Sequence, residues 1–447
     1  MHEYDVVIVG GGPGGLNAAI AAGRLGARTL LVERYAFLGG MSTAALVYPW
    51  MTFHDMQGQQ IVRGIPQEIV DRLTARGASP GHLRDTVGFC HSVTPFDKEV
   101  FKQIAVEMVR EAGADLLLHA LAAETRVAAG KIEAVTVVGP YGRLQVRGDV
   151  FVDGTGDCGL VAMAGGSTLL GRPADGKVQA MTMMMRVGGV DLDAVKAYMV
   201  AHPDEFWKDS RIDRLSEWPL TGVSGFFSLW ETYGPPEVPR DLVLFFAGVR
   251  PGEVHVNTTR VIDRDPTAIE AVTEAEIEGR AQVWPVLSFL QQHVPGFANS
   301  YLVETGPQIG IRESRRLQGR RMLTTEDITT GRRFEDVIAR NGYQIDIHDP
   351  EGKALVSQEL LESGYDIPYG ALVSSDLRNV LVAGRAISCS VEAFASLRTT
   401  PSCMAIGQAA GAAAAMASAR GCAPGELDVT ALQEALLRQD VHLDLPQ

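Results

Sequence analysis

The sequence has few cysteines, and their spacing excludes the usual cysteine-based sites. Five cysteines are scattered over 447 residues, without a C-x-x-C pair and without the spacing of zinc ligands. We therefore expect neither a dithiol redox motif nor a metal centre. An odd, scattered set favours reduced thiols in a cytoplasmic protein, each buried as a small apolar side chain. The five are Cys90, Cys158, Cys389, Cys403 and Cys422.

The sequence also lacks excess positive charge and long apolar runs. Its 40 Lys and Arg stand against 54 Asp and Glu, a formal net charge of −14. This balance argues against nucleic acid or an anionic membrane as the main partner. No uninterrupted apolar run reaches the ~20 residues that span a bilayer. A strand pattern begins within a few residues of Met1, so we expect no signal peptide.

A glycine-rich turn with the GxGxxG spacing occurs once, close to the N-terminus. Residues 5–9 predict a buried strand, and Gly10, Gly12 and Gly15 follow it before an Ala-rich helix and a second buried strand. Glu33 ends that second strand, about 20 residues after the turn, where a carboxylate can accept hydrogen bonds from a ribose diol. Strand, turn, helix and acid stand in the order that dinucleotide binding requires. A glycine-rich turn without a ligand is the alternative interpretation.

The same strand-to-glycine pattern returns twice, far along the chain. Residues 149–153 predict a buried strand that runs into Gly154-Thr155-Gly156-Asp157. Residues 379–383 predict another, which reaches Gly384-Arg385. Pro401 then predicts the start of a helix of small residues over 402–419. The nucleotide-binding unit is therefore expected to be discontinuous in sequence.

An antiparallel meander is predicted between the first two of these turns. Its strands are expected at 116–121, 132–138 and 144–146, after a helix over 98–111 that begins at the N-cap Asp97.

We predict an α/β protein of two domains. A Rossmann-like nucleotide domain with an inserted β-meander comprises residues 1–180 and 365–447. An α+β substrate (cap) domain comprises 181–364, where four of the five tryptophans lie. Residues 44–95 have weak periodicity, and we interpret them as a covering segment over the site.

Several motifs together resemble one family. The three turns and four further segments make the chain similar to the FAD-dependent oxidoreductase family of the glutathione-reductase-type flavoproteins. The similar segments are Gly39-Gly40-Met41-Ser42-Thr43, Arg312-Glu313-Ser314-Arg315-Arg316, Ile345-Asp346-Ile347-His348 and the stretch 395–411. The resemblance covers nearly the whole chain. Many members of the family have no assigned substrate.

The resemblance implies an FAD-binding domain and names residues for it. The glycine turn would hold the pyrophosphate, Glu33 the adenosine ribose, and the backbone near Leu121 the adenine. The helix after Pro401 would direct its N-terminus at the flavin. The cofactor-binding residues implied are Gly10, Gly12, Pro13, Gly14, Gly15, Glu33, Arg34, Gly39, Gly40, Met41, Ser42, Thr43, Leu121, Gly154, Thr155, Gly156, Asp157, Gly384, Arg385, Ser402 and Met404.

Four residues are candidates for the chemistry. Arg312 heads a run of five arginines between positions 312 and 321, which could bind an anionic substrate or form a solvated, paired face. His348, flanked by two aspartates, could be a general acid or base, or a structural bridge between loops. His255 lies in an alternating strand that could face the cleft. Arg398 precedes the C-terminal helix and would lie near the flavin.

These observations favour an FAD-dependent oxidoreductase that transfers a hydride between a small organic substrate and flavin N5. The sequence has a single GxGxxG motif, so we expect no built-in NAD(P)H-binding domain. The electron donor or acceptor would then be a separate, unknown partner. A biosynthetic protein of the thiazole-synthase type, holding NAD or FAD, is one alternative. A non-catalytic flavin-binding regulatory module is another. The sequence leaves open whether the protein forms a homo-oligomer.

Overall fold

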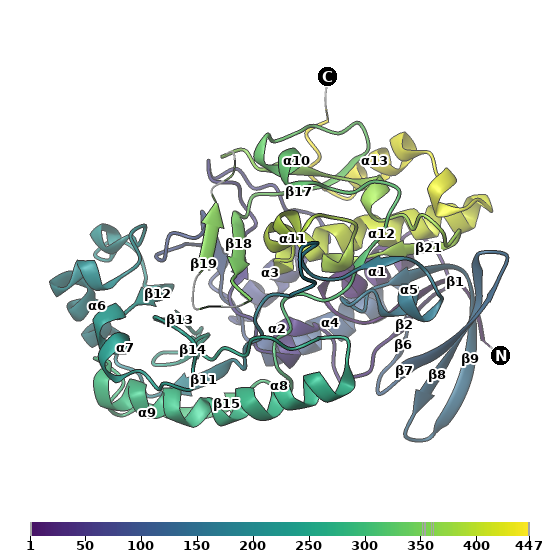
Figure 1. The fold of residues 1–447 in the computed structure, drawn as a ribbon. Helices are drawn as coiled ribbons and strands as arrows, with labels where there is room; N and C mark the ends of the chain where they lie inside the picture. The colour runs from purple at the N-terminus through teal and green to yellow at the C-terminus, as the bar shows by residue number, and fades with distance from the viewer. Residues whose placement is uncertain (1, 351, 353–354, 359, 361, 446–447) are drawn as a thin grey trace.

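A parallel sheet organises the larger of the two units (Figure 1). The structure is a computed structural model and describes residues 2–350, 352, 355–358, 360 and 362–445. The sheet has the order β6-β2-β1-β9, and β21 also pairs with β9. The last four residues of β1 and all of β2 are buried, as expected for strands that are covered on both faces. The strands are β1 His2–Val9, β2 Thr29–Val32, β6 Asp115–Leu117, β9 Gly142–Asp153 and β21 Val380–Val382.

Two helices of small residues pack against each other on this sheet. Helix α1 (Pro13–Arg24) follows the first glycine turn, and α12 (Thr400–Arg420) comes from the other end of the chain (Figure 1). A Cβ on Gly407 would lie 2.1 Å from the Gly14 oxygen. The two backbones therefore approach more closely than any side chain would allow. The remaining helices of this unit are α2 Met41–Ala44, α3 Ile65–Ala75, α4 Lys98–Glu111, α5 Gly159–Met163, α10 Thr325–Thr329, α11 Val391–Leu397 and α13 Val429–Arg438.

The meander is present, but its first strand was predicted in the wrong place. Its strands are β7 Leu121–Ala128, β8 Lys131–Gly139 and the first part of β9. The segment predicted at 116–121 instead contains most of β6, which pairs in parallel with β2. Strand β9 is continuous, so its first half belongs to the meander and its second half to the parallel sheet. The sequence pattern predicts two strands that are separated near Gly148, but this glycine lies within one continuous strand.

The second unit has a five-stranded sheet of its own, on the side of the molecule away from the meander (Figure 1). The order is β12-β13-β14-β11-β15. Its apolar core is a separate cluster, with members from Met181 to Ile309. The strands are β11 Met185–Gly188, β12 Gly222–Gly225, β13 Val243–Ala247, β14 Val254–Val256 and β15 Tyr301–Thr305. The helices are α6 Leu192–Ala201, α7 Phe227–Tyr233, α8 Ile269–Ala281 and α9 Val283–His293.

Described residues after Ile311 pack with the nucleotide domain, although the predicted cap domain extends to 364. Leu317, Val337 and Ile345 belong to the core cluster of the parallel sheet. We therefore propose a cap domain of about 181–311. The elements of the reassigned segment and its partners are β10 Thr168–Leu169, β16 Arg316–Leu317, β17 Val337–Asn341, β18 Ile345–His348, β19 Leu355–Gln358 and β20 Tyr365–Pro368. The short 3-10 helices of the chain are η1 Pro203–Glu205, η2 Ile212–Arg214, η3 Tyr369–Ala371, η4 Gly384–Ala386 and η5 Pro424–Glu426.

The segment 44–95 combines two tasks. It forms a small sheet and helix α3, and Trp50, Phe53 and Ile69 are buried in the core of the nucleotide domain. Tyr48 and Phe89 also line the cavity described below. The segment is thus an integral wall rather than a cover laid over the domain. Its strands are β3 Trp50–Met51, β4 Leu83–Arg84 and β5 Ser92–Thr94.

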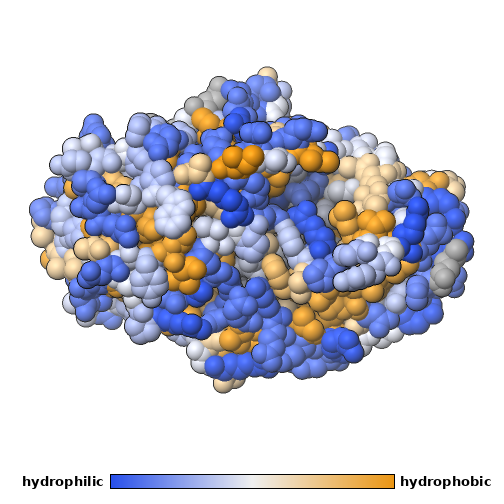
Figure 2. Space-filling model, turned by 90° about the horizontal axis from the view of Figure 1, so that it is seen from below, coloured by the Kyte–Doolittle hydropathy of each residue, from blue (hydrophilic) through white to orange (hydrophobic). Residues whose placement is uncertain are grey.

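The surface is mostly hydrophilic, with apolar side chains gathered in separate patches on the face shown in Figure 2. Within the described ranges, no helix combines the length and apolar character needed to cross a membrane. The same residues contain no group of three or more His, Cys, Asp or Glu placed to hold a metal ion. All five cysteines are free, and only Cys422 is not buried.

Candidate active site

One cavity of about 460 Å³ collects all three glycine turns. The turns follow β1, β9 and β21, so they meet at the carboxyl edge of the parallel sheet, where open α/β sheets bind ligands. Fifteen of the residues predicted to bind a cofactor line this cavity. They are Gly10, Gly12, Pro13, Gly14, Glu33, Arg34, Gly40, Met41, Leu121, Gly154, Thr155, Gly156, Asp157, Gly384 and Arg385.

The turns meet through backbone contacts that only glycine permits. Gly10 has a φ of +99°, and a Cβ there would lie 2.5 Å from the Gly154 oxygen. A Cβ on Gly14 would lie 2.6 Å from the Gly384 nitrogen. Three segments from distant parts of the chain thus form a single floor.

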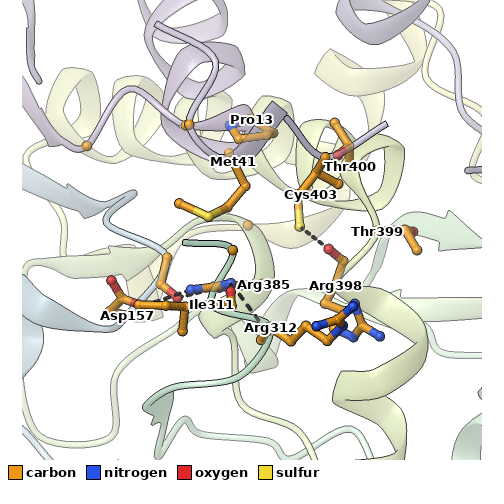
Figure 3. Close-up of a pocket in the computed structure, with 18 of the residues that line it drawn as sticks. Pro13, Met41, Asp157, Ile311, Arg312, Arg385, Arg398, Thr399, Thr400 and Cys403 are labelled. Atoms are coloured by element: carbon orange, nitrogen blue, oxygen red, sulfur yellow. Dashed lines mark hydrogen bonds and ion pairs between the residues drawn. The ribbon is translucent and has the colours of Figure 1, made fainter. Parts of the chain in front are cut away.

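Two helices present their N-termini to this floor. Helix α1 starts after the N-cap Gly12 and α12 after the N-cap Thr399, and neither has a side-chain cap hydrogen bond. The amide groups of a first turn need acceptors, and they carry the positive end of the helix dipole. Figure 3 shows Pro13, Thr400 and Cys403 near one another along the same side of the cavity. Both ends can therefore take negative charge from a ligand.

Glu33 is held in place by the backbone. Its Oε2 accepts a hydrogen bond from the Gly11 amide at 2.6 Å and its Oε1 one from the Tyr35 amide at 2.8 Å. Burial raises the pKa of this carboxyl, and the backbone amides oppose that effect. Each oxygen retains a lone pair, so the carboxylate can still accept from a diol. Arg34 donates to Gln308 at 2.9 Å at the rim.

Six of the predicted cofactor residues do not line the cavity. Gly15, Gly39, Ser42 and Thr43 lie behind the residues that do, and Thr43 donates to the Leu38 carbonyl. Ser402 and Met404 point into the protein instead. Helix α12 begins two residues earlier than predicted, so Thr399, Thr400 and Cys403 reach the cavity in their place. A helix counted from Thr400 would have placed Thr400 and Cys403, three residues apart, on one face, with the N-cap Thr399 beside them.

Comparison with known proteins decides the family. The profile of the FAD dependent oxidoreductase family matches residues 5–436. The chain belongs to the FAD dependent oxidoreductase family. It is an oxidoreductase whose cofactor is FAD, although the match does not extend to the narrower glutathione-reductase-type group.

Individual relatives match this FAD dependent oxidoreductase over short segments. A soluble pyridine nucleotide transhydrogenase of Mycobacterium bovis is 36% identical over 80 residues, 17% of each chain. A ferredoxin–NADP reductase of Salinispora tropica is 38% identical over 88 residues, 19% of this chain and 26% of the relative. The chain thus matches only a sixth to a quarter of these relatives' length. A solved p-nitrophenol 4-monooxygenase of Pseudomonas putida is 14% identical, with a TM-score of 0.49, and covers 99% of this chain and 87% of its own.

The residues present suit FAD. The cradle around Gly12 is open, because a Cβ there would have no neighbour closer than 3.7 Å. The uncapped turn of α1 suits a pyrophosphate, and the Glu33 carboxylate suits a ribose. We propose that these groups and the backbone beside Leu121 hold the dinucleotide. Arg385 is already engaged: it donates to the Gly156 carbonyl at 2.7 Å and to Asp157 at 2.8 Å, and also to the Ile311 carbonyl. Its task is to join the turns.

The other end of the cavity gathers arginines. Arg312 donates to the Ala180 carbonyl at 2.8 Å, to Thr182 at 2.7 Å and to Asn257 at 3.2 Å. Burial lowers the pKa of Arg312, and the nearby Arg398 and other arginines lower it further. Figure 3 shows the side chains of Arg312 and Arg398 approaching each other. The run of five arginines is therefore not one site, because Arg315, Arg316, Arg320 and Arg321 do not line the cavity.

His348 and Asp346 form a pair at this end. The Asp346 carboxylate receives a hydrogen bond from Arg398 at 3.1 Å, and His348 Nε2 lies 3.6 Å from its other oxygen. Burial lowers the pKa of His348 well below its ordinary value, so the ring is neutral at pH 7. Both side chains line the cavity. The structure therefore brings together three of the four residues predicted for the chemistry.

His255 is the exception. It lies behind Tyr48, with their ring centroids 3.9 Å apart, and does not line the cavity. Tyr48 separates it from the site, because strand β14 directs this side chain between the cap sheet and the segment 44–95. A catalytic role is therefore not supported by its position.

Replacing His255 with phenylalanine should make stability less dependent on pH. Burial lowers the pKa of His255 from 6.5 to about 3. Only the unfolded chain takes up a proton between these values, so acid favours unfolding by about 1.4 kcal/mol per pH unit for this residue. The variant should lose that slope between pH 6 and 4. Urea unfolding of both proteins at several pH values measures it, and identical slopes would contradict the prediction.

Proposed function

We propose that the protein transfers a hydride between a small organic substrate and N5 of its FAD. One observation carries the proposal: the dinucleotide turns and the cap domain line the same cavity. Strand β13 and the loop before it supply the cap wall, and the turns after β1, β9 and β21 supply the floor. A substrate between the two would be shielded from water on both sides.

Bound FAD supplies the two-electron chemistry, so the protein has to bind, orient and handle the proton. We assign the proton to His348, which is neutral, lines the cavity and is oriented by the Asp346 carboxylate. Arg312 and Arg398 lie beside this pair and favour negative charge on a bound substrate. The N-terminus of α12, whose N-cap Thr399 directly follows Arg398, adds to the same effect.

The narrower classification is part of this proposal. A parallel sheet with an inserted meander and a single GxGxxG supports a glutathione-reductase-type flavoprotein without its own NAD(P)H domain. A separate donor or acceptor would then exchange electrons with it, in the cytoplasm. The thiazole-synthase alternative needs a reactive donor cysteine. Cys403 is the cavity's cysteine among the described residues, and burial raises its pKa to about 12, so it is a poor donor.

Anaerobic reduction tests the function. The purified protein should be yellow, and FAD should be released on denaturation. A substrate should bleach the visible flavin absorbance, and air or an artificial acceptor should restore it. The His348→Gln variant should still bind FAD but bleach at least 100-fold more slowly. A different result would support the regulatory-module alternative: the protein holds FAD, no organic donor reduces it, and no organic acceptor oxidises its reduced form.

A further inference from the structure

Arg240 is a buried cation whose guanidinium pairs with no group among the described residues. Arg240 is 4% exposed and lines the cavity. Within the described part of the chain its guanidinium forms no hydrogen bond or ion pair, and its buried Nε has no acceptor. Arg312 and Arg398, by contrast, donate to named oxygens nearby. A buried charge is costly unless something pairs with it.

The charge persists at neutral pH. Burial and the neighbouring Arg260 lower the pKa of Arg240 to about 10, so it remains protonated at pH 7. Among the acidic residues that line the cavity, Asp346 lies beside the arginines, and it is already paired with Arg398. Asp241 follows Arg240 in the chain but is exposed. Both carboxylates oppose the lowering of the pKa of Arg240, but neither forms a hydrogen bond or ion pair with its guanidinium.

Three apolar side chains continue the same wall. Residues 240, 242, 244 and 246 all line the cavity: Leu244 and Phe246 alternate along β13, and residues 240 and 242 continue the wall from the segment before it. Val243 and Phe245, on the other face, belong to the cap core. The lining face thus begins with a cation and continues with Leu242, Leu244 and Phe246. At about 3.3 Å per residue the apolar part is ~13 Å long.

We propose that this wall is the substrate's recognition site and that the substrate is an apolar carboxylate. Its carboxylate would pair with Arg240, and its hydrocarbon part would lie along Leu242, Leu244 and Phe246. A planar carboxylate matches one free guanidinium fork through two parallel hydrogen bonds. Calling this ligand the substrate rests on the proposed function, but binding of the ligand can be tested without turnover.

Calorimetric titration of the FAD-loaded protein tests the site. The probes are sodium octanoate, sodium cinnamate, octanamide, sodium acetate and octyl phosphate. Octanoate or cinnamate should bind at least 30-fold more tightly than octanamide or acetate, because only they present both charge and an apolar body. Arg240→Met should weaken the binding of the apolar carboxylates at least 30-fold and leave that of octanamide within threefold. Arg240→Lys should retain part of the affinity.

A second measurement separates recognition from structure. Since Arg240 forms no hydrogen bond or ion pair with the residues that the structure describes, Arg240→Met should leave the melting temperature of the ligand-free protein unchanged or raise it. The matched control is Arg250→Met, which removes an exposed arginine of the same domain, paired with Asp97, and should not alter binding.

Four results would overturn the proposal. They are failure of both apolar carboxylates to bind, equal binding by Arg240→Met, a lowered melting temperature of that variant, or preference for octyl phosphate over octanoate. Tight carboxylate binding without flavin reduction would support this site and count only against the proposed turnover.

Discussion

Valine at position 12 is expected to abolish FAD binding while the apoprotein still folds. Gly12 lines the cavity at the start of α1, and a Cβ there would be 3.7 Å from the nearest atom, the Gly40 Cα. The backbone can therefore accept a side chain, but its methyl groups would fill the space over the turn. We expect FAD affinity to fall at least 100-fold in a fluorescence titration of the apoprotein. The free energy of unfolding should change by only about 1 kcal/mol, the cost of valine at an N-cap.

Valine at position 14 provides the contrast. Its Cβ would lie 2.6 Å from the Gly384 nitrogen and 2.8 Å from the Gly384 Cα, so two turns would have to separate. Overpacking of this kind costs about 3 kcal/mol or more, and it should appear as lost stability of the apoprotein. If Gly12→Val bound FAD normally, or unfolded as readily as Gly14→Val, the assignment of this floor to the pyrophosphate would be wrong.

Asp346→Asn is expected to destabilise the protein by about 3 kcal/mol. The carboxylate lies 3.1 Å from Arg398 and accepts a hydrogen bond from Tyr343 at 3.4 Å. Its loss leaves several arginines close together without a balancing charge, and breaking a buried pair costs roughly this much. Urea unfolding at pH 7 measures the effect, and activity should fall with it, because His348 loses the group that orients it.

The pH dependence of this loss has a definite sign. Burial alone would raise the pKa of Asp346, but hydrogen bonding from His348 and the charges of Arg398 and Arg312 bring it below its ordinary value. The ionised carboxylate therefore stabilises the folded state above pH ~4, and the contribution disappears in stronger acid. The difference between wild type and variant should be constant from pH 5 to 8.

A double-mutant cycle isolates the ion pair. Combining Asp346→Asn with Arg398→Met should cost at least 1 kcal/mol less than the sum of the single variants. Strict additivity would show that the two side chains do not depend on each other.

The dinucleotide unit was predictable because local chemistry fixes it. Gly10, the helix after it and Glu33 are determined by a turn that requires glycine and by two apolar strands, and both signals are short-range. The start of α12 was misplaced because Pro401 can occupy either of the first two helical positions. That shift of two residues exchanged Ser402 and Met404 for Thr400 and Cys403 at the cavity.

The rest of the site depends on long-range packing. The segment from 312 to 364 has the mixed composition of the cap, and only its contacts with α12 and the parallel sheet show where it belongs. Arg240 lies just before strand β13, and counting back in steps of two from Phe246 places it with Leu242 and Leu244. Nothing in the sequence shows that its guanidinium has no partner, since that depends on every segment around it.

The meeting of α1 and α12 has a consequence for biosynthesis. The half of the proposed cofactor floor that precedes α1 is translated first, and the helix that completes it begins at Thr400, nearly 400 residues later. A nascent chain therefore exposes an unfinished floor until α12 has been synthesised. We expect FAD to be captured only after both helices have formed and met, so cofactor supply would act on the assembled floor and not on early folding.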